Sequence, residues 1–251
     1  MASSEPLRRP SGAPRALILA AGRGERMRPL TDATPKPLLP VRGKPMVEWH
    51  LLALAAAGVR EVVINTAWLE EQFPAALGDG SRWGLRITYS HEGRRWGGAL
   101  ETGGGVATAL EALALGDDEP FWLVSGDIYM PGFAFQTSVA HDFAQSPDLG
   151  LLWMVPNPPF HTRGDFLLGA EQRLHRLEAA ASGQSLTYAS LALLKPGMVQ
   201  GLAPGQRASL APYLFKAADA GRLAGRVWEG PWENVGTPEQ WQALQASSIA
   251  G

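Results

Sequence analysis

Short apolar runs alternate with longer segments of helical periodicity through the first part of the chain. Apolar runs bounded by glycine or polar residues are typical of buried parallel strands. Alternation with helices predicts βαβ units, and therefore an α/β fold with a mostly parallel sheet. Strands are expected at 16–20, 61–65, 85–90, 121–125 and 149–155, and helices at 45–57, 69–77 and 102–115.

After Pro156 the rhythm changes, and sheet segments follow one another without helices between them. We expect sheet segments at 165–169, 173–177 and 186–194, then helices at 210–220 and 238–247. Residues 15–250 are interpreted as one domain with two halves, 15–157 and a smaller β-rich half at 158–250. The Ser/Pro-rich residues 1–14 are expected to form a disordered tail.

Composition narrows the possible functions. Of 251 residues 45% are hydrophobic, enough for a sizeable core, and the net charge of -2 offers no basic excess for a nucleic-acid backbone. The chain has no cysteine, which excludes disulfides, zinc–thiolate sites and cysteine nucleophiles. No apolar stretch resembles a signal peptide or a membrane span, so we expect a soluble cytoplasmic protein. The oligomeric state stays open between monomer and homodimer.

The first predicted strand runs into a glycine-containing loop, LILAAGRGERMRPLT over residues 17–31. Gly22 and Gly24 would let the backbone approach a ligand closely, and exposed N–H groups can cradle phosphate oxygens. Open parallel sheets bind ligands at the carboxyl ends of their strands, where this loop lies. Arg26 and Lys36 would add the cations that a triphosphate requires. The alternative is a tight turn with solvated arginines.

Two further stretches carry candidate chemistry. Asp127 follows the buried strand 121–125, and such a carboxylate suits Mg²⁺, although it could instead serve a turn or helix cap. The sequence Glu-Thr-Gly-Gly-Gly at 101–105 precedes a predicted helix. Its glycines would allow close approach to a nucleoside; the alternative is a helix start with Thr102 as N-cap.

Taken together, these motifs resemble those of sugar-1-phosphate nucleotidyltransferases, which condense a nucleoside triphosphate with a sugar 1-phosphate and release pyrophosphate. The resemblance covers about residues 15–250 and implies a Rossmann-like three-layer fold with a small β-rich sugar-binding part. It is carried by the segments 19–27, 29–31, 35–37, 63–65, 101–105, 125–127, 164–166 and 232–238.

The resemblance also implies roles for individual residues. Arg26 would hold the β- and γ-phosphates, Lys36 the phosphates at the reacting centre, and Asp127 the Mg²⁺ ion. Asp165 would contact the sugar phosphate or a sugar hydroxyl. The implied nucleotide-binding residues are Leu19, Ala20, Ala21, Gly22, Gly24, Glu25, Arg26, Lys36, Glu101, Thr102, Gly103 and Ser125.

Asn234 departs from the family pattern, which usually has Asp there as a second metal ligand. An amide oxygen can coordinate Mg²⁺ but brings no negative charge. Three outcomes are open: weaker metal binding, a metal held by Asp127 and phosphates alone, or lost activity. Glu233 is a less favoured substitute, because adjacent residues of an extended segment face opposite ways. Residues 94–98 look like a short insertion.

Within the family, the blocks 60–69 and 78–82 resemble the branch that acts on N-acetylmuramate 1-phosphate with UTP, in cell-wall sugar recycling. UTP and that sugar phosphate are therefore the expected substrates. Two alternatives remain open at this stage. One is guanylyl or thymidylyl transfer to mannose or glucose 1-phosphate, and the other is a non-catalytic nucleotide-sugar sensor, suggested by Asn234.

Overall fold

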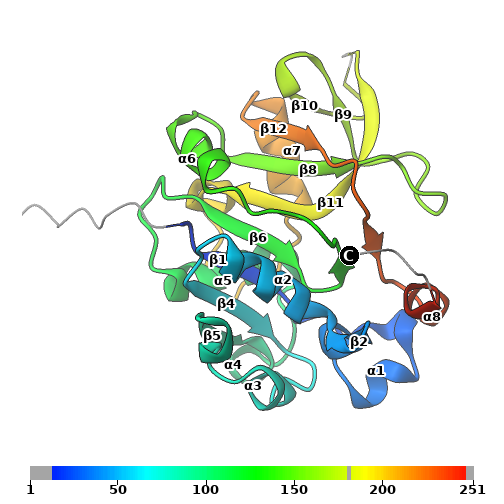
Figure 1. Cartoon of the computed structure of the whole chain (residues 1–251). Coiled ribbons are helices and arrows are strands. Elements are labelled where there is room, and N and C mark those ends of the chain that lie inside the picture. The colour runs from blue at the N-terminus through cyan, green and yellow to red at the C-terminus, as the bar shows by residue number, and fades with distance from the viewer. Residues whose placement is uncertain (1–12, 180–181, 247–251) are drawn as a thin grey trace, which may run out of the picture.

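The computed structural model of the chain describes residues 13–179 and 182–246. Residues 1–12 of the expected tail, and the end of the second half from 247 on, lie outside the described residues. The central element is a nine-stranded sheet whose main path runs in the order β10-β9-β11-β6-β1-β4-β5, with β8 paired to β11 and β12 paired to β8 (Figure 1).

The strands of this sheet and of two small ribbons are β1 (Ala16–Leu19), β2 (Pro40–Val41), β3 (Lys44–Pro45), β4 (Glu61–Thr66), β5 (Arg86–His91), β6 (Phe121–Ser125), β7 (Ile128–Tyr129), β8 (Gly150–Val155), β9 (Phe166–Leu168), β10 (Leu174–Arg176), β11 (Gln184–Leu194), β12 (Leu223–Val227) and β13 (Glu233–Asn234). The helices are α1 (Leu30–Ala33), α2 (Met46–Ala56), α3 (Gln72–Leu77), α4 (Glu92–Trp96), α5 (Glu101–Leu113), α6 (Thr137–Gln145), α7 (Ala211–Asp219) and α8 (Pro238–Ala246).

The first half of the chain forms the parallel part of the sheet, as expected. β1 pairs in parallel with both β4 and β6, and β4 pairs in parallel with β5. In this register Leu19 lies opposite Asn65 on one side and Ser125 on the other. The carboxyl ends of three strands therefore meet at one edge, which is where a ligand site is expected in such a sheet.

The second half extends the same sheet. β11 pairs antiparallel with β6, β8 and β9, so it joins the two halves into one continuous surface. Its pairing with β8 shifts register between Tyr188 and Ala192, and Ser190 within the shift has a positive φ of 60°. The sheet segments expected after Pro156 are thus strands of one continuous sheet, whose pairing is irregular at this point.

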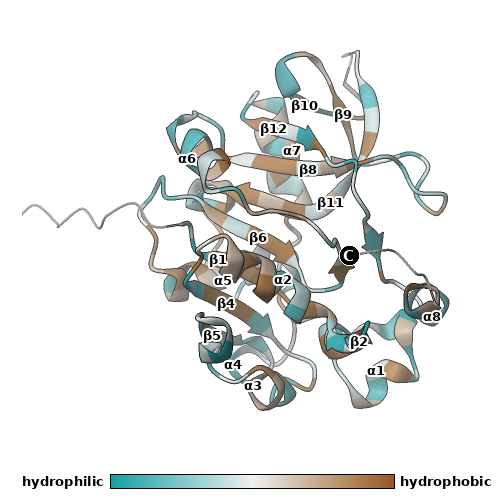
Figure 2. Cartoon of the chain, in the orientation of Figure 1, coloured by the Kyte–Doolittle hydropathy of each residue, from teal (hydrophilic) through white to brown (hydrophobic). Residues whose placement is uncertain are grey.

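Alternation along the central strands produces three layers. Ala16 and Ile18 belong to a core shared with α2, α3 and α6, whereas Leu17 belongs to a core shared with α5 and α7. Successive side chains of a strand point to opposite faces, so each face carries its own helices. In Figure 2 the hydrophobic colour is concentrated on the central strands and on α2.

Most expected elements are confirmed within a few residues, but three helices were not predicted. α1 and α6 lie in stretches for which no element was expected, and α4 overlaps the presumed insertion at 94–98. α6 buries Val139, Ala140 and Phe143, a spacing that could have identified it. None of the helices within the described ranges is long and apolar enough to cross a bilayer.

Candidate active site

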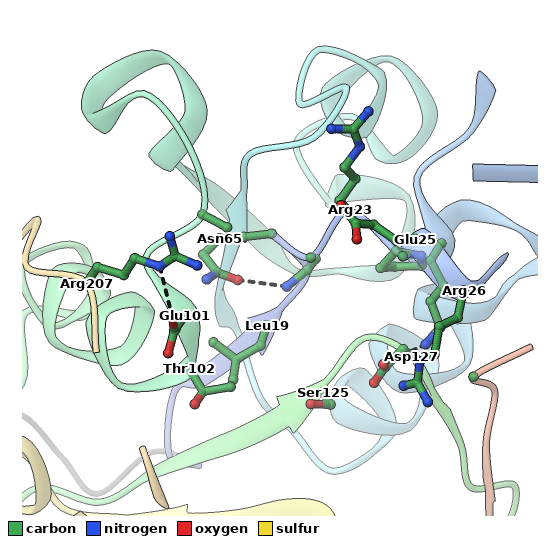
Figure 3. A pocket seen from close by; sticks show the side chains of 18 residues that line it. Leu19, Arg23, Glu25, Arg26, Asn65, Glu101, Thr102, Ser125, Asp127 and Arg207 are labelled. Atoms are coloured by element: carbon green, nitrogen blue, oxygen red, sulfur yellow. Dashed lines mark hydrogen bonds and ion pairs between the residues drawn. The ribbon is translucent and has the colours of Figure 1, made fainter. Parts of the chain in front are cut away.

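A cavity of about 540 Å³ opens at the carboxyl ends of β1, β4 and β6 (Figure 3). The glycine loop forms one side of it and the first turn of α5 forms another. Most residues that the sequence indicated for nucleotide binding line this one space. They are Leu19, Ala20, Ala21, Gly22, Gly24, Glu25, Arg26, Lys36, Glu101, Thr102 and Ser125, and the predicted metal ligand Asp127 lines the same space.

Lys36 and Asp127 meet in the wall of the cavity. Lys36 opens a short 3-10 turn and is only 7% exposed, and its Nζ donates to Oδ2 of Asp127 over 2.8 Å. Asp127 is held at the end of β6 because the N–H of Gly126 donates to the carbonyl of Leu19 over 2.8 Å. A Cβ at Gly126 would lie 3.1 Å from that carbonyl oxygen, so the close approach favours glycine.

The two loop glycines serve different purposes. Gly24 has a φ of +67°, and a Cβ there would lie 3.0 Å from Thr31 and 3.2 Å from Lys36. Its carbonyl accepts hydrogen bonds from the hydroxyl of Thr31 and the N–H of Met27. Gly24 is therefore required by the turn. A Cβ at Gly22 would meet nothing within 4 Å, so the backbone at Gly22 is open to the cavity.

A two-residue ribbon brings Asp127 and Asn234 together. In the β7–β13 pair Asn234 lies opposite Ile128, and the N–H of Val235 donates to the carbonyl of Asp127 over 3.1 Å. Beneath the ribbon, buried His50 donates through Nε2 to the carbonyl of Ile128 over 2.8 Å. Burial lowers the pKa of His50 to about 4, so its ring is neutral at physiological pH. His50 is thus a buried histidine whose hydrogen bond to the backbone supports the ribbon.

A second cavity, of about 460 Å³, adjoins the first. Asp165 lies in it, and its carboxylate is held on both sides: Oδ1 lies 3.0 Å from Nε2 of His161, and Oδ2 accepts the N–H of Tyr188 over 2.8 Å. Asn234 lines this space as well. Much of the remaining wall is aromatic, from Phe160, Phe166, Tyr188, Phe215 and Trp232.

Arg26 lines both cavities. Its guanidinium has no ion-pair partner within residues 13–179 and 182–246, and a Cβ at Gly236 would lie 3.7 Å from both of its terminal nitrogens. A cation placed at the junction of two cavities, with no carboxylate of its own, can meet an anion from either side.

Residues 15–163 match the sequence profile of the nucleotidyl transferase family. The chain belongs to this family. Two relatives are both named N-acetylmuramate alpha-1-phosphate uridylyltransferase. The protein from Neisseria meningitidis is 43% identical over 235 residues, covering 92% of this chain and 97% of its own. The protein from Caulobacter vibrioides is 34% identical over 238 residues, covering 92% of this chain and 95% of its own.

The fold of this nucleotidyltransferase also matches a solved structure. A crystal structure described as a glucose-1-phosphate thymidylyltransferase from Bacillus anthracis superposes with a TM-score of 0.76, covering 93% of this chain and 94% of that one, at 19% identity. The mostly parallel, three-layer architecture predicted from the sequence is therefore confirmed. At this identity the match establishes the fold alone.

The donors in this nucleotidyltransferase suit a metal ion that arrives with its substrate. Within the described residues no three His, Cys, Asp or Glu side chains gather as an all-protein cage. Asp127 offers one carboxylate, 37% exposed, to the first cavity, and Asn234, which pairs with the next residue Ile128 in the ribbon, lines the second cavity. Mg²⁺ commonly takes one or two protein oxygens and completes its shell with phosphates and water, so these residues fit it.

One predicted contact is not supported by the geometry. Gly103 does not line the cavity, because its Cα faces the backbone of Ser209, where a Cβ would lie 2.8 Å from the carbonyl oxygen. A Cβ at Gly104 would lie 2.3 Å from the carbonyl oxygen of Gln206. These glycines allow the loop before α7 to pack on the first turn of α5, rather than allowing a ligand to approach. Only Glu101 and Thr102 of this motif face the cavity.

The structure also adds residues that sequence reasoning missed. Arg207 lines the cavity from the loop before α7, and its Nε donates to Oε1 of Glu101 over 2.9 Å (Figure 3). Arg23 lines the cavity too, with its guanidinium 4.4 Å from the ring of Trp68. No local sequence signal marks Arg207, because more than 100 residues separate it from its partner.

Proposed function

We propose that this nucleotidyltransferase joins UTP to N-acetylmuramate 1-phosphate, forming the UDP-sugar and pyrophosphate. The observation that carries the proposal is the pair of cavities that meet at Arg26, one cationic and one partly aromatic. The first suits a polyphosphate, and the second suits a sugar. The choice of UTP and of N-acetylmuramate rests on two relatives of that name, which this chain matches along nearly their whole length.

The reaction is a displacement at phosphorus. A phosphate oxygen of the sugar phosphate forms a bond to the α-phosphorus of UTP, and the bond from that phosphorus to the α,β-bridging oxygen breaks. Pyrophosphate leaves with the electron pair. Both reactants are anionic, so most of the catalytic task is to hold them in line and to offset their charge. No covalent protein intermediate is needed.

The residues of the first cavity supply that charge and position. Arg26 binds the β- and γ-phosphates at the junction, and the open backbone at Gly22 lies against the phosphates. Lys36, which is ion-paired with Asp127, donates to phosphate oxygens at the reacting centre. Asp127 would hold Mg²⁺, with the amide oxygen of Asn234 as the candidate second ligand. The ion would add positive charge where negative charge grows during the reaction.

The second cavity positions the sugar. Asp165 is fixed by His161 and Tyr188, yet a carboxylate has about four acceptor sites, so Asp165 can still accept a sugar hydroxyl. The aromatic rings would cover the apolar faces of the sugar and its substituents. Because the reaction consumes a nucleoside triphosphate, we assign it to the cytoplasm.

A substrate panel tests this proposal. Pyrophosphate release is measured with UTP, GTP or dTTP against N-acetylmuramate, glucose and mannose 1-phosphates, each with Mg²⁺. The expected result is the highest kcat/KM for UTP with N-acetylmuramate 1-phosphate, and release about 10²–10³-fold slower from a Lys36→Ala preparation. A higher kcat/KM for another pair would show that the members of that pair are the substrates instead. Nucleotide binding without product from any pair would make the chain a sensor.

A further inference from the structure

A buried chain of hydrogen bonds crosses the floor between two walls of the first cavity. The N–H of Ala20 donates to Oδ1 of Asn65 over 2.7 Å. The amide Nδ2 of Asn65 donates to Oε1 of Glu92 over 2.7 Å. The other carboxylate oxygen of Glu92 accepts the N–H of Leu100 over 2.8 Å. Three side-chain hydrogen bonds thus connect β1, β4, α4 and the start of α5.

This chain of hydrogen bonds is almost wholly buried. Glu92 is 0% exposed and Asn65 is 2% exposed. Gly105 packs directly on both, since a Cβ there would lie 2.5 Å from Nδ2 of Asn65 and 3.0 Å from Oε1 of Glu92. The third glycine of the 101–105 motif is therefore explained by this chain of bonds. Burying a carboxylate whose partners are neutral N–H groups costs free energy. Hydrogen bonds to both of its oxygens are needed to offset that cost.

The two backbone N–H groups at the ends of this series determine which atom donates and which accepts in every one of its hydrogen bonds. The N–H groups of Ala20 and Leu100 can only donate. Asn65 must then turn its oxygen to Ala20 and its NH₂ to Glu92, so both oxygens of Glu92 must accept. An ionised carboxylate accepts both bonds and adds no donor of its own, whereas an amide would set its NH₂ group against one of these donors. Burial raises the pKa of Glu92, while the bonds from Leu100 and Asn65 favour the charged form.

The two ends of this series of hydrogen bonds lie in two walls of the first cavity. Ala20 begins the glycine loop, and Leu100 directly precedes Glu101 and Thr102 at the start of α5. We propose that Glu92 is a positioning residue which, through Asn65, sets the distance between the phosphate-binding loop and the wall at the start of α5. This inference rests on the proposed function only for the identity of the ligand between those walls.

A reversal of the bonding pattern tests the proposal. Glu92→Gln places an NH₂ against a donor, so one end of the chain loses its acceptor. Adding Asn65→Asp restores every bond: Asp accepts from Ala20 and from the new Gln, and the Gln oxygen accepts from Leu100. We expect Glu92→Gln to raise KM for UTP about tenfold while KM for the sugar phosphate changes less than about twofold. The double variant should return KM for UTP to within about threefold of wild type.

Amide hydrogen exchange at Ala20 and Leu100 supplies a readout that needs no substrate. Exchange should quicken at one or both amides in Glu92→Gln and slow again in the double variant. Glu111→Gln is the matched control, because this exposed α5 carboxylate lies outside the chain of bonds, and it should match wild type in every measurement.

The outcomes separate this inference from the proposed function. Unchanged exchange and KM in Glu92→Gln, or a folded double variant as impaired as Glu92→Gln, would overturn the positioning role. If Glu92→Gln fails to fold, a folded and active double variant supports the role, and a double variant that also fails to fold overturns it. If wild type turns over no UTP, the proposed function fails, while the exchange measurements still decide the role of Glu92.

Discussion

The two cavities are built in different ways. The first takes most of its lining from one continuous stretch, residues 19–37, and from the ends of neighbouring parallel strands. The second is assembled from segments near 160–166, 187–190, 211–215 and 232–234, which meet only in the folded chain. The first presents charged groups and open backbone to its interior, whereas much of the second is aromatic. We infer that the first provides charge for the chemistry and the second provides shape for selection.

The largest expected effect concerns the charges of the first cavity. Lys36→Ala or Asp127→Ala should lower kcat by about 10²–10³-fold with every sugar phosphate, because each removes a preorganised charge at the reacting centre. Steady-state kinetics at controlled Mg²⁺ concentration measure this. Arg28→Ala is the control, since it breaks only the exposed Arg28–Asp32 pair in the same region. Turnover close to wild type in either variant would contradict the assignment.

A change to acid pH tests the support of the ribbon beside Asp127, where buried His50 donates to the carbonyl of Ile128. The pKa of His50 is about 4 in the folded chain and 6.5 in its ordinary state. Between these values the unfolded chain binds a proton that the folded chain does not. This contribution to stability is complete above about pH 6.5 and is lost as pH falls towards 4, a change of as much as about 3 kcal/mol.

Urea unfolding at about pH 7.5 and about pH 4.5 measures this loss. His50→Gln keeps an N–H donor for the carbonyl of Ile128 but cannot titrate, so its stability should vary less between the two conditions. An equal loss in wild type and His50→Gln would show that another group causes the acid sensitivity.

Substitutions in the second cavity should change the selection of the sugar phosphate rather than the rate of the chemical step. Asp165→Asn should raise KM for the sugar phosphate about tenfold, since it weakens the acceptor offered to the sugar, and should leave KM for UTP unchanged. His161→Gln should act in the same direction. Arg163→Ala changes an exposed neighbour paired with Glu178 and serves as the control. If KM for UTP rose as much as KM for the sugar phosphate, the two cavities would not divide the substrates as proposed.

The smallest expected effect lies on the ribbon between the cavities. Asn234→Asp adds a second carboxylate near Asp127 and should lower the Mg²⁺ concentration for half-maximal activity a few-fold. Titration of activity with Mg²⁺ measures this. Glu233→Gln is the matched neighbour, and Glu233 lines neither cavity described above. A shift in the Mg²⁺ requirement with Glu233→Gln instead would identify Glu233 as the second metal ligand.

The sequence by itself determined the parallel strands, the principal helices and the residues of the glycine loop. These features are local: an apolar run of strand length, a helical repeat and small residues after a strand each limit the backbone within about ten residues. The parallel sheet then brings the ends of β1, β4 and β6 to one edge. For this reason Arg26, Lys36 and Asp127 could be predicted to share a cavity, and the family resemblance added Ser125.

Only the tertiary structure decided what lies opposite those residues. Arg207 reaches Glu101 from the other half of the chain, and the Asn65–Glu92 bond joins side chains 27 positions apart. The ribbon strands β7 and β13 have two residues each, too few to show any periodicity. The glycines at 103–105 indicate that other atoms pack closely against the backbone there, but the sequence does not indicate which atoms. The absence of a Cβ is a property of one residue, whereas the atoms that pack against that residue are determined by the packing of the whole fold.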